Sequence, residues 1–275
     1  MLIPARLRGA VPAIAACAFL VFMSGCADLS TASKTTPNSD SGTVSGPTQK
    51  LGDGLAKTYV TLGDDGHPTE VGVRLTAAAL NGLPQADTTL MLAFPDQAAT
   101  TAFNHVMLNW NFQGHVPRKL FGKPHFDFHF VMADMATMQS INPSDPNYAT
   151  KAEHFPEAKY VPQDYVLPPG PPAAAQAVPG MGVHLVDSTD TSLVPGKYDF
   201  TQILINGVWD GRYIFHEPMI TRAWLLTEPS LDQPLKLPQA YQQSAYYPTT
   251  YGVHFDRQAN EYVVSLGSLT MRDAS

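Results

Sequence analysis

Residues 124–131 constrain the fold more than any other segment, because polar and aromatic side chains alternate there with a period of two. This period is typical of a β-strand with one face in a hydrophobic core. The aromatic residues of the predicted strand face that core together: Phe126, Phe128 and Phe130. His125, Asp127 and His129 then face the opposite side, where three potential metal ligands or acid–base groups lie in one row.

The first 25 residues have the features of an export signal. Two basic residues, Arg6 and Arg8, precede a short apolar run and a few small residues. Such a segment is removed from the mature protein and does not span the membrane. Cys26 directly follows Ser-Gly, which resembles the lipobox of bacterial lipoproteins, so we expect Cys26 to be acylated, as with palmitate, and to become the first mature residue. An ordinary signal peptide that contains a cysteine is the alternative interpretation.

The segment after the signal predicts where the protein is held. Ala27 follows the cysteine, and by resemblance to the sorting rules of two-membrane bacteria this favours the outer membrane over the inner one. We therefore expect an exported chain, anchored in the cell envelope by a lipid on Cys26. Residues 27–50 form a predicted flexible tether, because 14 of these 24 residues are Ser, Thr, Gly or Pro and offer little to bury.

Charge and cysteine content argue against several classes of partner and against stabilisation by disulfides. Without the signal, the chain keeps 15 basic and 24 acidic residues, a net charge of −9. An acidic chain disfavours nucleic acid and anionic lipid as partners, so we expect membrane attachment through the lipid alone. Cys17 lies in the signal, and acylation of Cys26 leaves no thiol for a disulfide or a metal. A hydrophobic core must then stabilise the fold.

Residues 51–275 are predicted to form one mostly β domain, an antiparallel sandwich or barrel with one or two short helices. Short β-rich runs alternate with turn residues along this part of the chain. Two dipeptides predict hairpin turns: Asn206-Gly207 and Asp210-Gly211. Six prolines within residues 160–180 predict a long irregular segment laid over the domain.

The histidine row needs partners from elsewhere in the chain. In a regular strand His125 and His129 lie about 13 Å apart at their Cα atoms, too far for both to bind one ion without a bend. Asp127, between them, is expected either as a metal ligand or as the group that orients a histidine ring.

Two distant strand-like segments supply these partners. His184 and Glu217 each lie in a run bordered by Gly or Pro, and His115 in a polar loop is a weaker candidate. The predicted pocket comprises His125, Asp127, His129, His184 and Glu217. Such a set suits one divalent ion, either Zn, Mn, Fe, Ni or Cu. It is similar to the ligand set of cupin-type sites, although the spacing differs.

Two functions remain open from the residues alone. In the first, the pocket binds a divalent metal or a small polar ligand, and Asp127 or Glu217 serves as general base if the protein is an enzyme. In the second, the protein is a non-catalytic binding or assembly protein of the envelope. Its histidine row is then a structural hydrogen-bond network, and a homo-oligomer interface is the functional surface. No known catalytic motif decides between them.

Several strings resemble an uncharacterised group of bacterial extracytoplasmic β proteins, typified by a member under sigma-E and anti-sigma-E control. The strings are Gly114-His115-Val116-Pro117, His125-Phe126-Asp127-Phe128-His129-Phe130, Met181-Gly182-Val183-His184, Glu217-Pro218-Met219-Ile220-Thr221 and Tyr247-Pro248-Thr249-Thr250-Tyr251. The resemblance runs from Leu51 to the end of the chain. It implies that six residues belong to a shared pattern: His115, His125, Asp127, His129, His184 and Glu217. It departs at Leu185, where an aromatic residue is expected, and it implies no reaction.

Overall fold

The computed structural model describes residues 42–190 and 193–275, which fall within the compact unit Asn38–Ser275. The predicted signal, the predicted lipidation site at Cys26 and the first part of the tether lie outside the described residues. None of the helices in these two ranges is long and apolar enough to cross a membrane.

Two seven-stranded sheets form most of this unit, and neighbouring strands in both are antiparallel. The first sheet contains β1 (Gly42–Ser45), β2 (Gln49–Leu51), β3 (Gly54–Leu62), β4 (Pro68–Thr76), β12 (Ser230–Pro234), β14 (Thr250–Asp256) and β15 (Glu261–Gly267). Its order is β1-β3-β4-β15-β14-β12, with β2 paired to β3. The second sheet contains β5 (Thr88–Ala93), β6 (His105–Asn111), β7 (His125–Val131), β8 (Tyr165–Val166), β9 (Val183–Asp187), β10 (Gln202–Trp209) and β11 (Arg212–Thr221). Its order is β5-β6-β7-β11-β10-β9-β8, and β13 (Ala245–Tyr247) pairs separately with β16 (Thr270–Arg272).

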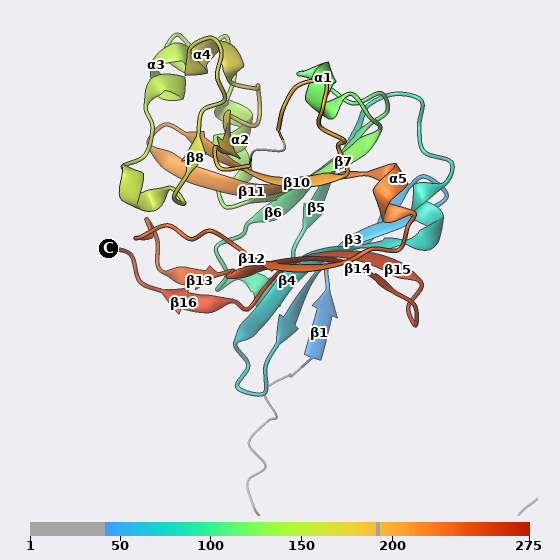
Figure 1. The fold of residues 1–275 in the computed structure, drawn as a ribbon. Helices are drawn as coiled ribbons and strands as arrows, with labels where there is room; N and C mark the ends of the chain where they lie inside the picture. Colours follow the sequence, from blue (N-terminus) through green and yellow to red (C-terminus); the bar gives the residue numbers. More distant parts are fainter. Residues whose placement is uncertain (1–41, 191–192) are drawn as a thin grey trace, which may run out of the picture. The chain divides into compact units, whose positions relative to one another are not determined.

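The two open sheets stack as a sandwich, which confirms the predicted mostly β, antiparallel fold (Figure 1). One hydrophobic core joins them, with Val73 and Val264 from the first sheet and Phe126, Phe128 and Phe130 from the second. All three phenylalanine rings of β7 are fully buried. The alternation in the sequence therefore identified the core face of β7 correctly.

The described residues contain more helices than the predicted one or two. They are α1 (Arg118–Phe121), α2 (Met135–Ser140), α3 (Tyr148–Glu153), α4 (Ala173–Gln176) and α5 (Arg222–Leu225), with 3-10 turns η1 (Ala77–Leu80), η2 (Asp96–Ala98) and η3 (Ala158–Tyr160). Each is only one or two turns long, too short to give a helical period in the sequence, and tertiary packing rather than propensity stabilises helices of this length. Residues 160–180 are mainly irregular, as predicted, around β8 and α4.

Part of the predicted tether belongs to the sheet, which corrects the expected start of the domain at residue 51. The strand β1 pairs with β3 along its whole length, from Gly42 opposite Leu62 to Ser45 opposite Tyr59. Val44 packs against the main core. The open edge of β3 supplies backbone hydrogen bonds that a composition count does not reveal.

A helical layer covers the second sheet on the side turned away from the first sheet. Figure 1 shows α2, α3, α4 and β8 over this outer face, with α1 beside them. Two smaller apolar clusters attach this layer. One contains Val183, Leu185 and Phe215, and the other contains Phe121 and Phe200. The polar side of β7 lies beneath them.

We predict that Phe128→Ala lowers the free energy of unfolding by about 3–5 kcal/mol, because it removes a buried ring and leaves a cavity between the sheets. Urea denaturation followed by circular dichroism measures this loss. Leu55→Ala is the control, because Leu55 is 45% exposed and should change stability by less than about 0.5 kcal/mol. Equal losses in the two variants would contradict the position of the core.

Candidate metal centre

The polar row of β7 lies at the middle of the second sheet, between β6 and β11. Asp127 is opposite Asn109 of β6 and Met219 of β11. His125, Asp127 and His129 are all buried. This position places them on the covered outer face of the sheet rather than on a solvated surface.

His115 joins the row from the loop between β6 and α1. Gly114 has a φ of +69°, and a Cβ atom there would lie 2.1 Å from the carbonyl oxygen of Phe121. The backbone N–H of His115 donates to that same oxygen at 3.1 Å. Glycine is therefore required at position 114, and the tight loop turns the His115 ring toward β7.

His115, His125 and Asp127 form the first group of candidate ligands. The Nε2 atom of His125 lies 3.0 Å from Oδ1 of Asp127, and Nε2 of His115 lies 3.5 Å from Oδ2. Each of the three residues offers one potential ligand atom, and these atoms lie within 4.8 Å of one another. Two imidazoles and one carboxylate are a common ligand set for zinc and non-haem iron.

Backbone carbonyls fix the tautomer of both rings in this group. Nδ1 of His125 donates to the carbonyl oxygen of Lys123 at 2.6 Å, and Nδ1 of His115 donates to that of Val116 at 2.7 Å. In the neutral ring, each Nε2 then carries a lone pair. Hydrogen bonds of this kind orient histidine ligands in metal sites.

The contact between His125 and Asp127 brings two acceptors together. His125 Nε2 and Asp127 Oδ1 are both buried, and neither has a hydrogen-bond partner, although they are 3.0 Å apart. An N–H on this nitrogen would not point at the oxygen. Asn111 holds the other oxygen, since its Nδ2 donates to Asp127 Oδ2 at 2.6 Å. A cation between nitrogen and oxygen would satisfy both atoms.

The charges of the first group favour an ionised carboxylate. Burial by itself raises the pKa of Asp127, but the neighbouring His115 and His125 rings outweigh it and hold that pKa well below its usual range. Burial lowers the pKa of His115, and the Asp127 carboxylate outweighs this effect, so the pKa of His115 is raised. Asp127 therefore attracts positive charge to this position.

His129, His184 and Glu217 form the second group. The register of β7 and β11 places Glu217 opposite His129, and His184 comes from β9. Nε2 of His129 lies 3.3 Å from Oε1 of Glu217, and Nε2 of His184 lies 3.4 Å from Oε2. Chosen ligand atoms of these residues also lie within 4.8 Å of one another.

Gly207 allows the second group to form, and its position corrects a predicted turn. Asn206 and Gly207 lie inside β10, whereas the hairpin turns at Asp210 and Gly211. A Cβ atom on Gly207 would lie 2.1 Å from the ring of Phe215. Asn-Gly looks like a turn, but here glycine makes room for an aromatic ring on the neighbouring strand.

The ring of Phe215 packs against both histidines of the second group. Its centroid is 4.9 Å from that of His129 and 5.3 Å from that of His184. Burial lowers the pKa of His129 to about 4 and that of His184 to about 3. Burial, followed by the charge of Asp127, raises the pKa of Glu217 well above its usual range. All three shifts disfavour charge on these side chains.

The structure brings together all six candidate residues on one sheet face but divides them into two groups. His125 and Asp127 join His115, the weaker candidate, whereas His129 joins His184 and Glu217. The expected separation of His125 and His129 along the strand agrees with this division. Each of the two carboxylates suggested as general bases belongs to one of these candidate ligand groups.

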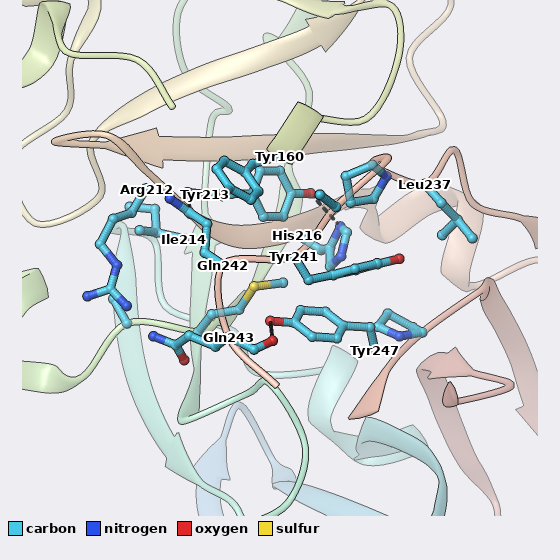
Figure 2. Close-up of a pocket in the computed structure, with 15 residues that line it drawn as sticks. Tyr160, Arg212, Tyr213, Ile214, His216, Leu237, Tyr241, Gln242, Gln243 and Tyr247 are labelled. Carbon is cyan, nitrogen blue, oxygen red and sulfur yellow. Dashed lines mark hydrogen bonds between the residues drawn. The ribbon is translucent and has the colours of Figure 1, made fainter. Parts of the chain in front are cut away.

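Sequence reasoning missed two residues near the site. One is Asn111 at the end of β6, which orients Asp127 and which no motif in the sequence marks. The other is His216, which faces the opposite side of β11 from Glu217 and lines a pocket with Tyr213 and Tyr241 (Figure 2).

His216 is a buried histidine of the same sheet whose Nδ1 contacts polar side chains. Its Nδ1 lies 2.9 Å from the Tyr213 hydroxyl, the contact drawn in Figure 2, and 2.9 Å from Asn206 Oδ1. Burial lowers the pKa of His216 to about 3, so this ring is a neutral, hydrogen-bonded histidine. It shows how the same sheet satisfies a buried imidazole without an ion.

Comparison with known proteins gives one partial likeness. A family model named TTHB210-like, described as "Hypothetical protein TTHB210", matches residues 63–110. This segment contains β4, β5 and most of β6, and none of the six candidate ligands lies in it. No curated protein and no solved structure matches the chain. The function is therefore argued from the site itself.

We predict that Gly207→Ala displaces Phe215 and lowers the free energy of unfolding by about 1–3 kcal/mol through overpacking. It should also shift the NMR resonances of the His129 and His184 rings. Gly72→Ala is the matched control, because a Cβ there would lie 2.6 Å from the Tyr59 ring in the other sheet. The control should lose similar stability but leave those histidine resonances in place; shifts in both variants, or in neither, would contradict this role of Gly207.

Proposed function

We propose that the protein is a metal-binding protein of the bacterial cell envelope, with a divalent ion held by His115, His125 and Asp127. Three protein ligands leave at least one position on the ion for water or a small polar ligand. The proposal is a binding function, and the chemistry available to it is that of a Lewis acid.

One observation carries the proposal: His125 Nε2 and Asp127 Oδ1 face each other as buried acceptors without hydrogen bonds. Leaving such atoms unpaired costs about 1–3 kcal/mol each. A structural hydrogen-bond network, the alternative function of this row, would instead pair them as His216 is paired. The observation therefore favours an ion over a network.

Access and orientation support an exchangeable site. The side chain of His115 is 36% exposed, whereas that of His125 is fully buried. The ion would therefore meet solvent on the His115 side. With Asp127 as a ligand, oriented by Asn111, this carboxylate is not free to act as general base.

The cellular location in this proposal is supported by the sequence of the first 27 residues. A lipobox-like Ser-Gly-Cys after an apolar run favours a lipid anchor on Cys26, and Ala27 favours the outer membrane. The resemblance to the sigma-E-controlled extracytoplasmic group agrees with an envelope location. The membrane would then be a partner through the lipid alone.

We predict that the full chain, purified without an affinity tag and loaded with Zn²⁺, loses one equivalent of bound metal on the change Asp127→Asn. Metal per chain, measured by mass spectrometry after desalting, gives the result. Unchanged metal content in a folded Asp127→Asn variant would contradict the proposed site.

Two asparagine variants on β6 test whether Asp127 must be oriented to bind zinc. Asn111→Ala frees the Asp127 carboxylate and should weaken zinc binding by about 10–100-fold. Asn109→Ala is the control, because Asn109 donates to Thr89 at 2.8 Å and not to the carboxylate. Equal zinc affinities in the two variants would show that Asn111 does not orient a metal ligand.

We predict that Cys26→Ser moves the protein from the membrane fraction to the soluble fraction of its native host, because the lipid is the proposed anchor. Immunoblotting of the separated fractions measures the shift. The conservative control is Cys17→Ser, which should stay membrane-bound. Retention of Cys26→Ser in the membrane fraction would contradict the anchor.

A further inference from the structure

We infer that His129, His184 and Glu217 bind a second divalent ion in a closed, structural site that fastens β9 to the centre of the second sheet. This ion is separate from the one proposed at Asp127 and does not depend on it.

The second group holds buried polar atoms that no protein group satisfies. Nε2 of His129 and Oε2 of Glu217 have no hydrogen-bond partner. The side chains of these residues are only 1% and 2% exposed. A buried imidazole and a buried carboxyl group without partners are unfavourable, and here they point at each other.

The distances fit an ion better than a shared proton. Ligand atoms around tetrahedral zinc lie about 3.3 Å apart, because each bond is about 2.0–2.2 Å. The observed contacts are 3.3 Å between Oε1 of Glu217 and Nε2 of His129, and 3.4 Å between Oε2 of Glu217 and Nε2 of His184. A proton on Glu217 would draw its oxygen closer to a single ring and could serve only one of them.

β10 separates the strand that carries His184 from the two strands that carry His129 and Glu217. β10 lies between β11, which carries Glu217, and β9, which carries His184. On the intervening strand, the residue opposite His184 is Gly207. The Phe215 ring packs over this glycine, and the side chains of His184 and Glu217 still meet at 3.4 Å. An ion can therefore bridge across β10.

This bridge would reinforce a weakly attached edge of the sheet. β9 pairs with β10 through only three residue pairs, from Asn206–Leu185 to Val208–Val183. β8, beyond β9, contributes two further pairs. An ion shared by β7, β11 and β9 adds a link that the backbone ladder lacks.

Apolar neighbours close this second site. The Phe215 ring packs against both histidines, and the side chains of His129 and Glu217 are almost fully buried. His184 is 19% exposed as a side chain, about half the value for His115 in the first group. We therefore assign this ion a structural role, with release through local opening of β9.

Metal stoichiometry and release test this inference. The full chain is purified without a tag, loaded with Zn²⁺, desalted and exposed to EDTA, and retained zinc is measured over time. The wild type should hold two equivalents, one of them released about tenfold or more slowly than the other. Glu217→Gln should remove only the slowly released ion, and Asp127→Asn only the fast one.

Thermal unfolding provides a second readout of the structural role. Free zinc at about 100 times the dissociation constant of the second site should raise the wild-type midpoint by roughly 5–10 °C. This part of the shift should vanish in Glu217→Gln and remain in His105→Gln. His105 is the control because it is a buried histidine of β6 whose Nε2 also lacks a partner. If Glu217→Gln fails to fold, His184→Gln replaces it.

The outcomes separate the two proposals. If Glu217→Gln and Asp127→Asn each remove the same single equivalent of zinc, the protein binds one shared ion and the second site is wrong. If Glu217→Gln keeps the slowly released ion and the full thermal shift, the second site is also wrong. If Asp127→Asn changes nothing while Glu217→Gln removes the slow ion, the first site fails and this inference stands.

Discussion

The pleat of β7 is the constraint on which the site depends, because alternate residues of a strand must face opposite sides of the sheet. Burial of Phe126, Phe128 and Phe130 in the sandwich fixes which side is which. A slip of one residue would turn the phenylalanines outward and the histidines into an apolar core. The hydrophobic energy of one face therefore positions the ligands of the other.

The covering layer turns this polar row into a site. Histidines and carboxylates on an open sheet would be solvated, and water would satisfy their polar atoms. Here α1 to α4 and two apolar clusters exclude water, so atoms such as Asp127 Oδ1 and His129 Nε2 are buried without partners. The divalent ions that we propose would offset this cost while the cover stays in place. The two groups then differ mainly in solvent access. The partly exposed His115 opens the first group to solvent, whereas the Phe215 ring covers the second.

The sequence predicted the part of this arrangement that depends on local pattern. The period of two gave the strand and its core face, and the same period correctly separated His125 from His129. The pairing of distant strands is not encoded locally, so the division of the ligands into two groups followed only from the register of β7 against β11. The dipeptide Asn206-Gly207 predicts a turn wrongly, because the residue that requires glycine at position 207, Phe215, lies on another strand.

The most direct measurement is the anomalous diffraction of crystals grown with Zn²⁺, collected on both sides of the zinc absorption edge. We expect an anomalous peak about 2.0–2.2 Å from Nε2 of His115, Nε2 of His125 and a carboxylate oxygen of Asp127. A well-ordered map in which zinc is absent from this position, and water or a direct hydrogen bond pairs His125 with Asp127, would contradict the account.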